Sequence, residues 1–166
     1  MTRNIYLLRH AQSADKQSGQ TDKDRVLTAQ GESDAKKLGT FLKKSDIRFD
    51  RIISSTARRA QSTTLLVCQS LGYETNTIIW DDHLYATSGV QIVQRVIHQE
   101  NSLKNILIVG HNPAISEAAE LLSCEDSIYL VPATLVQIAF LGDWSSVEHP
   151  NGQLMKILEP GQVPSS

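Results

Sequence analysis

The sequence predicts a three-layer α/β/α sandwich with a mostly parallel central sheet. Segments with the length and apolar character of strands alternate along the chain with segments of helical periodicity. The run Ile106–Val109 is apolar at every position, as expected for a parallel strand that is covered on both faces. A chain of 166 residues suits one domain with a sizeable core, which we expect at residues 1–160.

The first half of the chain predicts three strands and two helices. The strands are expected at Ile5–Leu8, Arg51–Ser54 and Asn76–Trp80, and the helices at Ala29–Lys44 and Ala57–Leu71. Thr28 is a good N-cap residue, and Gly72 is the residue type that ends a helix in the left-handed conformation. The segment Ala11–Val26 is polar and aperiodic, and a loop of this length in a compact domain is more often functional or mobile than idle.

The second half predicts two more helices and three more strands. The helices are expected at Gly89–Gln99 and from Pro113 to about Leu122, and the strands at Ile106–Val109, Leu135–Phe140 and Gln153–Leu158. Ser88 and Gln91 have the spacing of a capping box, and Asn112 fits the N-cap of the second helix. We expect the tail from Pro160, including residues 161–166, to be frayed.

The composition argues against several classes of partner. A formal net charge of -2 gives no basis for binding nucleic acid or an anionic membrane. No apolar run approaches the ~18 residues that a membrane-spanning helix needs. Because the first predicted strand starts almost at Met1, we expect no signal peptide and a cytoplasmic protein. Two cysteines, Cys68 and Cys124, do not make a disulfide framework.

Polar clusters follow three of the predicted strands. Arg9-His10 follows the first strand, Ser54–Ala60 follows the second, and His111-Asn112 follows the strand at residues 106–109. If these strands are parallel, their carboxyl ends share one edge of the sheet, where open α/β sheets bind ligands. If the first and fourth strands are neighbours, His10 and His111 face each other.

Arginines and histidines at one sheet edge suit chemistry on a phosphate group. Guanidinium groups are always charged and match phosphate oxygens bidentately. An imidazole attacks only when it is neutral, and nearby arginine charges lower the pKa of a histidine and so keep it neutral near pH 7. A single histidine is more often structural than catalytic. Together, however, these residue types give an electrostatic arrangement that suits phosphoryl transfer to a histidine, although their spacing alone does not establish it.

At these positions the sequence resembles the histidine phosphatase superfamily, also called the phosphoglycerate-mutase-like family. Leu7–Ala11 resembles its first signature, with alanine where glycine is usual. Ser54–Thr63 resembles the second motif, a serine-rich turn that leads into Arg-Ala-x-x-Thr, with Thr56 where the family often has proline. This alignment makes Arg59, and not Arg58, the second phosphate-binding arginine.

Three further segments extend the resemblance. Val109–Pro113 resembles the third motif, which carries the second histidine. Asp24–Gly31 and Asp81–Tyr85 are similar to segments of the short bacterial phosphohistidine phosphatases, the SixA-like branch. The resemblance runs from Ile5 to Leu122 in the family's order, and it implies the phosphoglycerate-mutase-like α/β fold.

The resemblance implies a phosphatase in which His10 is the nucleophile. His10 would form a phosphohistidine intermediate, which water then hydrolyses. Arg9, Arg59 and His111 would hold the phosphoryl group through the transition state. Larger relatives supply a glutamate as general acid from a lid insertion after the third strand, and this chain has only a short segment there.

The general acid is therefore the open role. Asp81 is the first candidate and Asp82 the second, although a plain loop or capping role fits both as well. A phosphohistidine substrate needs a proton donor less, because its N–P bond is labile. Arg25, Ser13 and Asn112 are expected to bind the substrate, and the missing lid suggests an open pocket for a phosphate on a protein surface.

Three functions remain in view. The first is dephosphorylation of phosphohistidine on a protein, and the second is hydrolysis of small phosphomonoesters. The third belongs to another class: a non-catalytic module that binds phosphorylated proteins, which would not need a nucleophile. No Walker A or Gly-x-Gly-x-x-Gly pattern indicates a nucleotide cofactor, and no His/Cys/Asp cluster has the spacing of metal ligands. We expect no cofactor and no metal, and the sequence makes no prediction of oligomeric state.

Overall fold

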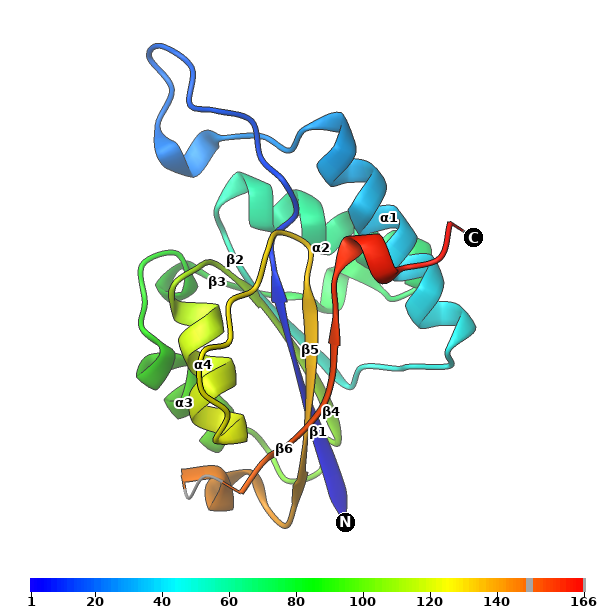
Figure 1. Cartoon of the computed structure of the whole chain (residues 1–166), viewed down its shortest axis with the longest axis vertical. Coiled ribbons are helices and arrows are strands. Elements are labelled where there is room, and N and C mark those ends of the chain that lie inside the picture. Colours follow the sequence, from blue (N-terminus) through cyan, green and yellow to red (C-terminus); the bar gives the residue numbers. More distant parts are fainter. Residues whose placement is uncertain (149–150, 166) are drawn as a thin grey trace.

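A mixed β-sheet forms the centre of the protein (Figure 1). The computed structural model describes residues 1–148 and 151–165, and within them the sheet has six strands in the order β3-β2-β4-β1-β5-β6. The strands are β1 (Thr2–Arg9), β2 (Arg51–Ser55), β3 (Ile79–Asp81), β4 (Asn105–Gly110), β5 (Leu135–Leu141) and β6 (Gln153–Leu158). The first four are mutually parallel, and β5 and β6 add antiparallel pairings at one side. The prediction of a mostly parallel sheet is confirmed.

Helices cover both faces of this sheet, which gives the predicted three layers. The helices are α1 (Ala29–Lys44), α2 (Arg58–Leu71), α3 (Gly89–Ile97) and α4 (Ala114–Ser123). Figure 1 shows α1 and α2 on one side and α3 and α4 on the other. None of the helices within the described ranges is both long enough and apolar enough to cross a membrane.

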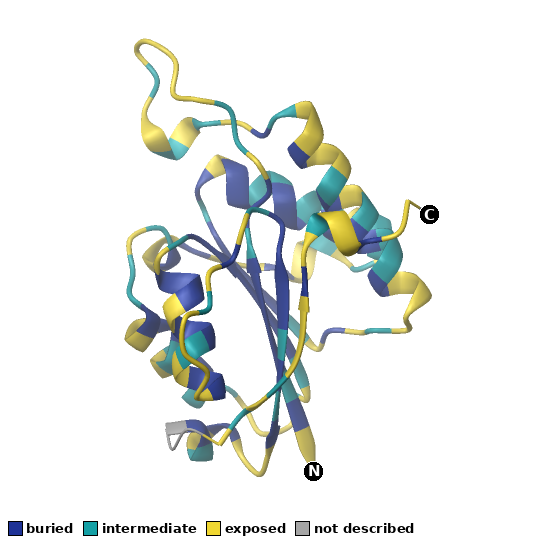
Figure 2. Ribbon diagram, viewed as in Figure 1, coloured by how far each residue is buried: buried dark blue, intermediate teal, exposed yellow. Residues whose placement is uncertain are grey.

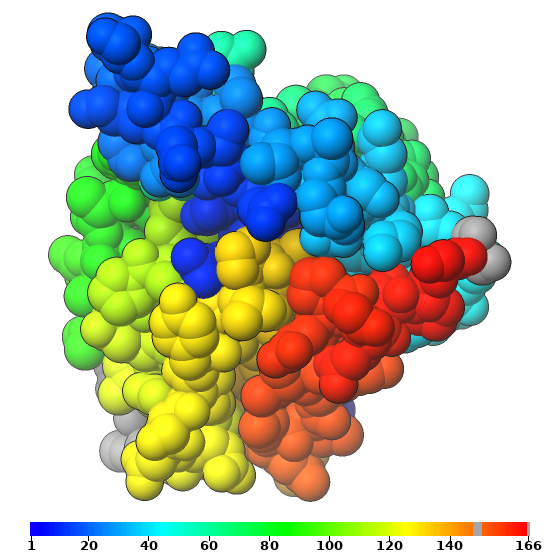
Figure 3. All heavy atoms as spheres, turned by 45° about the horizontal axis from the view of Figure 1, so that its top comes forward, coloured from blue at the N-terminus to red at the C-terminus, as the bar shows by residue number. Residues whose placement is uncertain are grey.

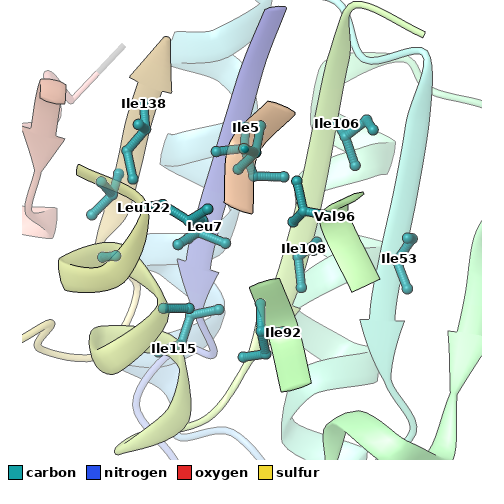
Figure 4. Close-up of a cluster of buried hydrophobic side chains, with 14 of the residues drawn as sticks. Ile5, Leu7, Ile53, Ile92, Val96, Ile106, Ile108, Ile115, Leu122 and Ile138 are labelled. Carbon is teal, nitrogen blue, oxygen red and sulfur yellow. The ribbon is translucent and has the colours of Figure 1, made fainter. Parts of the chain in front are cut away.

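Alternate side chains of the central strands enter two separate cores. Ile5 and Leu7 of β1 pack toward α3 and α4, whereas Tyr6 and Leu8 pack toward α1 and α2. Figure 4 shows the first of these cores, and Figure 2 shows the strands as the most buried part of the chain. Because successive strand residues point to opposite faces, a stretch buried on both faces must be apolar throughout, as residues Ile106–Val109 of β4 are.

The local signals for helix ends are confirmed at three places. The Thr28 hydroxyl accepts a hydrogen bond from the Gly31 amide, so Thr28 caps α1 as predicted. Ser88 and Gln91 form both hydrogen bonds of the capping box at the start of α3. Gly72 ends α2 with φ 84°, a left-handed backbone conformation that residues with a Cβ atom rarely adopt.

Three local predictions were wrong. The strand expected at residues 76–80 is only Ile79–Asp81, because Thr75–Thr77 form a 3-10 turn and β3 pairs with a single neighbour at the sheet edge. Pro113, and not Asn112, occupies the N-cap of α4. The tail is not frayed from Pro160: residues 160–162 form a 3-10 turn and Val163 is buried in the core, while Ser166 lies outside the described residues.

Strand register brings the ends of β1 and β4 together. Leu8 pairs with Val109, and Arg9 pairs with Gly110. The His10 amide continues this ladder by donating to the Gly110 carbonyl at 3.1 Å. The residues that follow the two strands, His10 and His111, therefore leave the sheet side by side at its carboxyl edge.

Candidate active site

The carboxyl edge of the sheet holds a cavity of about 330 Å³. It is lined by Arg9, His10, Gln12, Ser13, Arg25, Arg59, His111, Asn112 and Pro132. Seven of the eight site residues expected from the sequence are in this lining, and Asp81 is not. In the space-filling view, the blue N-terminal segment and the yellow segment near residue 130 meet on this face of the molecule (Figure 3).

His10 presents an unprotonated ring nitrogen. Its Nδ1 lies 2.7 Å from the Ala11 carbonyl oxygen, which can only accept a hydrogen bond, so Nδ1 carries the proton. Its Nε2 accepts a hydrogen bond from Nε of Arg59 at 3.3 Å. The side chain is 7% exposed. The contact with Ala11 fixes the tautomer in which Nε2 is unprotonated, which is the form that can act as a nucleophile.

His111 lies against His10, with the two ring centroids 5.1 Å apart. Its Nε2 is 2.7 Å from the hydroxyl of Ser55, which also accepts a hydrogen bond from the Ala57 amide. Its Nδ1 is buried and has no hydrogen-bond partner among the described residues. A buried polar nitrogen without a partner is costly, so Nδ1 is suited to contact a ligand oxygen in the cavity.

Burial lowers the pKa of both histidines. The pKa of His10 falls from 6.5 to about 4, first because the ring is desolvated and then because Arg59, Arg9 and Arg25 repel a positive charge. The pKa of His111 falls to about 3, again first through desolvation, with His10 and the arginines adding to the effect. Both rings are therefore neutral near pH 7, as a histidine nucleophile requires.

This neutrality predicts the pH response of the site. In an NMR titration assigned with His10→Gln and His111→Gln, the His10 ring should protonate near pH 4, well below the usual 6.5. Because the unfolded chain binds these protons at higher pH, the free energy of unfolding should be greatest above pH 6.5 and fall as the pH drops toward 4. A His10 midpoint near 6.5 would contradict the buried, arginine-flanked site.

Arg59 and Arg9 reach the cavity from different elements. Arg59 is the second residue of α2 and is only 7% exposed. Besides Nε on His10, its terminal nitrogens donate to the carbonyl oxygen and the carboxylate of Asp22 at 2.7 and 3.1 Å. Arg9 ends β1 and donates to the Leu130 carbonyl at 2.9 Å, and its buried Nε has no partner among the described residues.

The long loop after β1 is fastened at its base by Arg25. Arg25 donates through Nε to the Ala14 carbonyl and through Nη2 to the Ser13 hydroxyl, both at 2.9 Å. Ser13 also forms a β-bridge with Leu27. Both Arg25 and Ser13 line the cavity, and the contacts that hold them are within their own loop.

The two candidates for the general acid, Asp81 and Asp82, are not among the residues that line the cavity. The Asp81 carboxylate accepts a hydrogen bond from the His83 amide at 3.0 Å and so caps the short turn that follows β3. The same carboxylate forms an ion pair with Arg95. β3 is the edge strand, so β2 and β4 separate Asp81 from the end of β1. Asp82 is exposed, and its carboxylate accepts from Thr56 and from Lys23. None of these contacts involves His10, and the role of general acid stays a prediction for both residues.

Asn112 is placed at the cavity by a contact that sequence reasoning missed. Its amide nitrogen donates to the Leu130 carbonyl at 2.9 Å, and its side-chain oxygen accepts from the Ser116 hydroxyl at 2.6 Å. Gln12 and Pro132 complete the lining and were also missed. No group of three or more His, Cys, Asp or Glu side chains in the described part of the chain could hold a metal ion.

Residues 5–84 match the model of the histidine phosphatase superfamily, branch 1. A solved structure extends the likeness over nearly the whole chain. It is named as the phosphohistidine phosphatase SixA from Agrobacterium tumefaciens and is 25% identical to this chain. The two structures superpose with a TM-score of 0.82, over 95% of this chain and 98% of that one. The family model covers 80 of the 166 residues, and together with the SixA structure it supports assignment to the histidine phosphatase superfamily. Its second-histidine motif lies beyond the matched residues, and the structure brings it to the cavity.

Two more proteins are similar to all or part of this chain. Phosphoglycerate mutase from Bacillus anthracis is 15% identical with a TM-score of 0.68, covering 98% of this chain and 95% of its own, and confirms the phosphoglycerate-mutase-like fold. The mitochondrial serine/threonine-protein phosphatase PGAM5 of Xenopus tropicalis is 41% identical over 70 residues, which are 42% of this chain and 24% of PGAM5. The matched region is thus about a quarter of the length of that relative.

Proposed function

We propose that this histidine phosphatase hydrolyses phosphate groups through a phosphohistidine intermediate on His10. Nε2 of His10 forms a bond to phosphorus as the bond to the leaving group breaks. Arg9, Arg59 and Nδ1 of His111 hold the phosphoryl oxygens, whose charge grows in the transition state. Water then attacks the intermediate, which releases inorganic phosphate and restores neutral His10. The neutral, tautomer-fixed His10 between arginines supports this sequence of steps.

We propose further that the substrate is phosphohistidine on a protein. The observation that carries this proposal is the lack of a carboxyl group among the described residues that line the cavity. An alcohol leaving group needs a proton as its P–O bond breaks, and general acid catalysis is worth about 10²–10⁴-fold in rate. The labile N–P bond of phosphohistidine depends much less on such a donor.

The comparisons support a phosphorylated protein as the substrate. The SixA structure from Agrobacterium tumefaciens carries the name of a phosphohistidine phosphatase, and PGAM5 carries that of a serine/threonine-protein phosphatase. The first name refers to phosphohistidine and the second to phosphate on a protein. PGAM5 gives one reason to test phosphoserine and phosphothreonine beside phosphohistidine.

The experiment compares four substrates at equal enzyme concentration. A histidine-phosphorylated protein, a phosphoserine peptide, a phosphothreonine peptide and a small phosphomonoester are incubated with the chain, and phosphate release and intact mass are followed. We expect kcat/KM for phosphohistidine to exceed that for the esters by about 100-fold, the lower bound of what a missing acid costs. Preference for an ester would overturn the substrate assignment. Tight binding of phosphoprotein without turnover would instead indicate a binding module.

A further inference from the structure

Asp22 connects the long loop to the arginines of the site. It opens the 3-10 turn Asp22–Asp24. Its carboxylate accepts from the Tyr85 hydroxyl at 2.6 Å, from Arg59 at 3.1 Å and from Arg25 at 3.2 Å, and its carbonyl accepts from Arg59 at 2.7 Å. Asp22 therefore joins its own loop, through Arg25, to two segments that are distant in sequence and contain Arg59 and Tyr85.

The nitrogens of the Arg59 guanidinium have two different partners, His10 and Asp22. Nε faces the nucleophile His10, and both terminal nitrogens are held by Asp22. A guanidinium is a rigid planar fork, so fixing its terminal nitrogens also fixes the direction of Nε and of the remaining N–H groups. Tyr85 stabilises this arrangement twice, through its hydroxyl on Asp22 and through its ring, whose centroid is 5.9 Å from Arg59.

We propose that Asp22 is a positioning residue, which aims Arg59 and Arg25 at the phosphoryl group and docks the loop against the cavity. The inference rests on the proposed function, because it takes Arg59 to contact the phosphoryl group. Asp22 also adjusts the charge of the site. Three arginines and one carboxylate leave two net positive charges beside neutral histidines, which matches a phosphoryl dianion.

The carboxylate stays ionised in this role. The Tyr85 hydroxyl and the two arginines hold the pKa of Asp22 well below its usual range. An ionised carboxylate cannot donate a proton to a leaving group. Asp22 is therefore assigned to orient the arginines and is not a substitute for the missing general acid.

The test compares Asp22→Ala with Asp24→Ala. We expect Asp22→Ala to lower kcat/KM for phosphohistidine by about 10- to 100-fold, the loss given by charged hydrogen bonds and by an ångström of misplacement. Asp24 lies in the same turn, and its carboxylate contacts Thr21 and no arginine of the site. Asp24→Ala should therefore keep full activity. Wild-type activity in Asp22→Ala would overturn the proposal.

A double-mutant cycle separates positioning from a general loss of structure. The hydroxyl of Tyr85 contacts Asp22, so Tyr85→Phe should lower kcat/KM a few-fold in the wild type and have no further effect in Asp22→Ala. Additive losses would show that the two residues act independently and would contradict the proposal.

A second readout does not depend on turnover. NMR relaxation of the Arg59 Nε–H group should report a rigid side chain in the wild type and in Asp24→Ala, and a mobile one in Asp22→Ala. A rigid Arg59 in Asp22→Ala would refute the positioning role. Failure of the wild type to hydrolyse any phosphate would refute the proposed function. The NMR measurement would still test whether Asp22 holds Arg59 in place.

Discussion

Replacement of His10 with alanine is expected to abolish the phosphoenzyme and to lower kcat/KM by about 10⁴-fold or more, the usual cost of losing a covalent nucleophile. Nε2 of His10 is the atom that the site prepares for attack: it is unprotonated, it accepts from Arg59, and its ring is neutral at pH 7. The measurement is intact mass after rapid mixing with phosphohistidine protein, together with phosphate release. The wild type should gain the mass of one phosphoryl group, and His10→Ala should not.

His98 supplies the matched control. It is an exposed histidine at the end of α3, and its Nδ1 contacts the Gln94 carbonyl in its own helix. His98→Ala should therefore form the phosphoenzyme at the wild-type rate. Unchanged turnover in His10→Ala, or a phosphoenzyme of normal yield, would show that another residue attacks phosphorus.

The fold could be predicted wherever one physical signal dominated. The bounds of α1 were predicted to the residue, because Thr28 marks its start and the apolar spacing its length. β4 was clear because both of its faces are buried. The third strand was misplaced because Ile79 and Trp80 lie exposed at the sheet edge, where little burial shapes the sequence. At such a position the β-propensity of the residues alone is a weak guide to where the strand begins and ends.

The candidate site was predictable to the extent that strand ends determine it. His10 and His111 follow adjacent parallel strands, so their meeting follows from sheet topology. Asp22 did not stand out, since nothing in a polar loop distinguishes one aspartate from the others. Its partners Arg59 and Tyr85 lie 37 and 63 residues away, and only the folded chain brings them together. Asp81 stays an untested candidate for the general acid, and its carboxylate caps its own turn.

Arg59→Ala is expected to lower kcat/KM by about 10²–10³-fold, the cost of removing one preorganised donor to a developing negative charge. The variant removes the donor to Nε2 of His10 and leaves the carboxylate of Asp22 without its buried arginine partner. Arg59→Lys should recover part of the loss, because an ammonium retains the charge and lacks the planar fork. Steady-state kinetics with a phosphohistidine protein measure both effects.

Arg58→Ala is the control that tests the helix register. Arg58 is exposed at the first position of α2, whereas Arg59 is buried one residue later on the face that meets the cavity. We expect Arg58→Ala to keep wild-type kcat/KM, and equal losses in the two variants would place the wrong arginine at the phosphate. Arg59 also repels a proton from His10, so the His10 pKa should rise in Arg59→Ala and stay unchanged in Arg58→Ala. One titration thus distinguishes an arginine that acts on the nucleophile from one that contributes only surface charge.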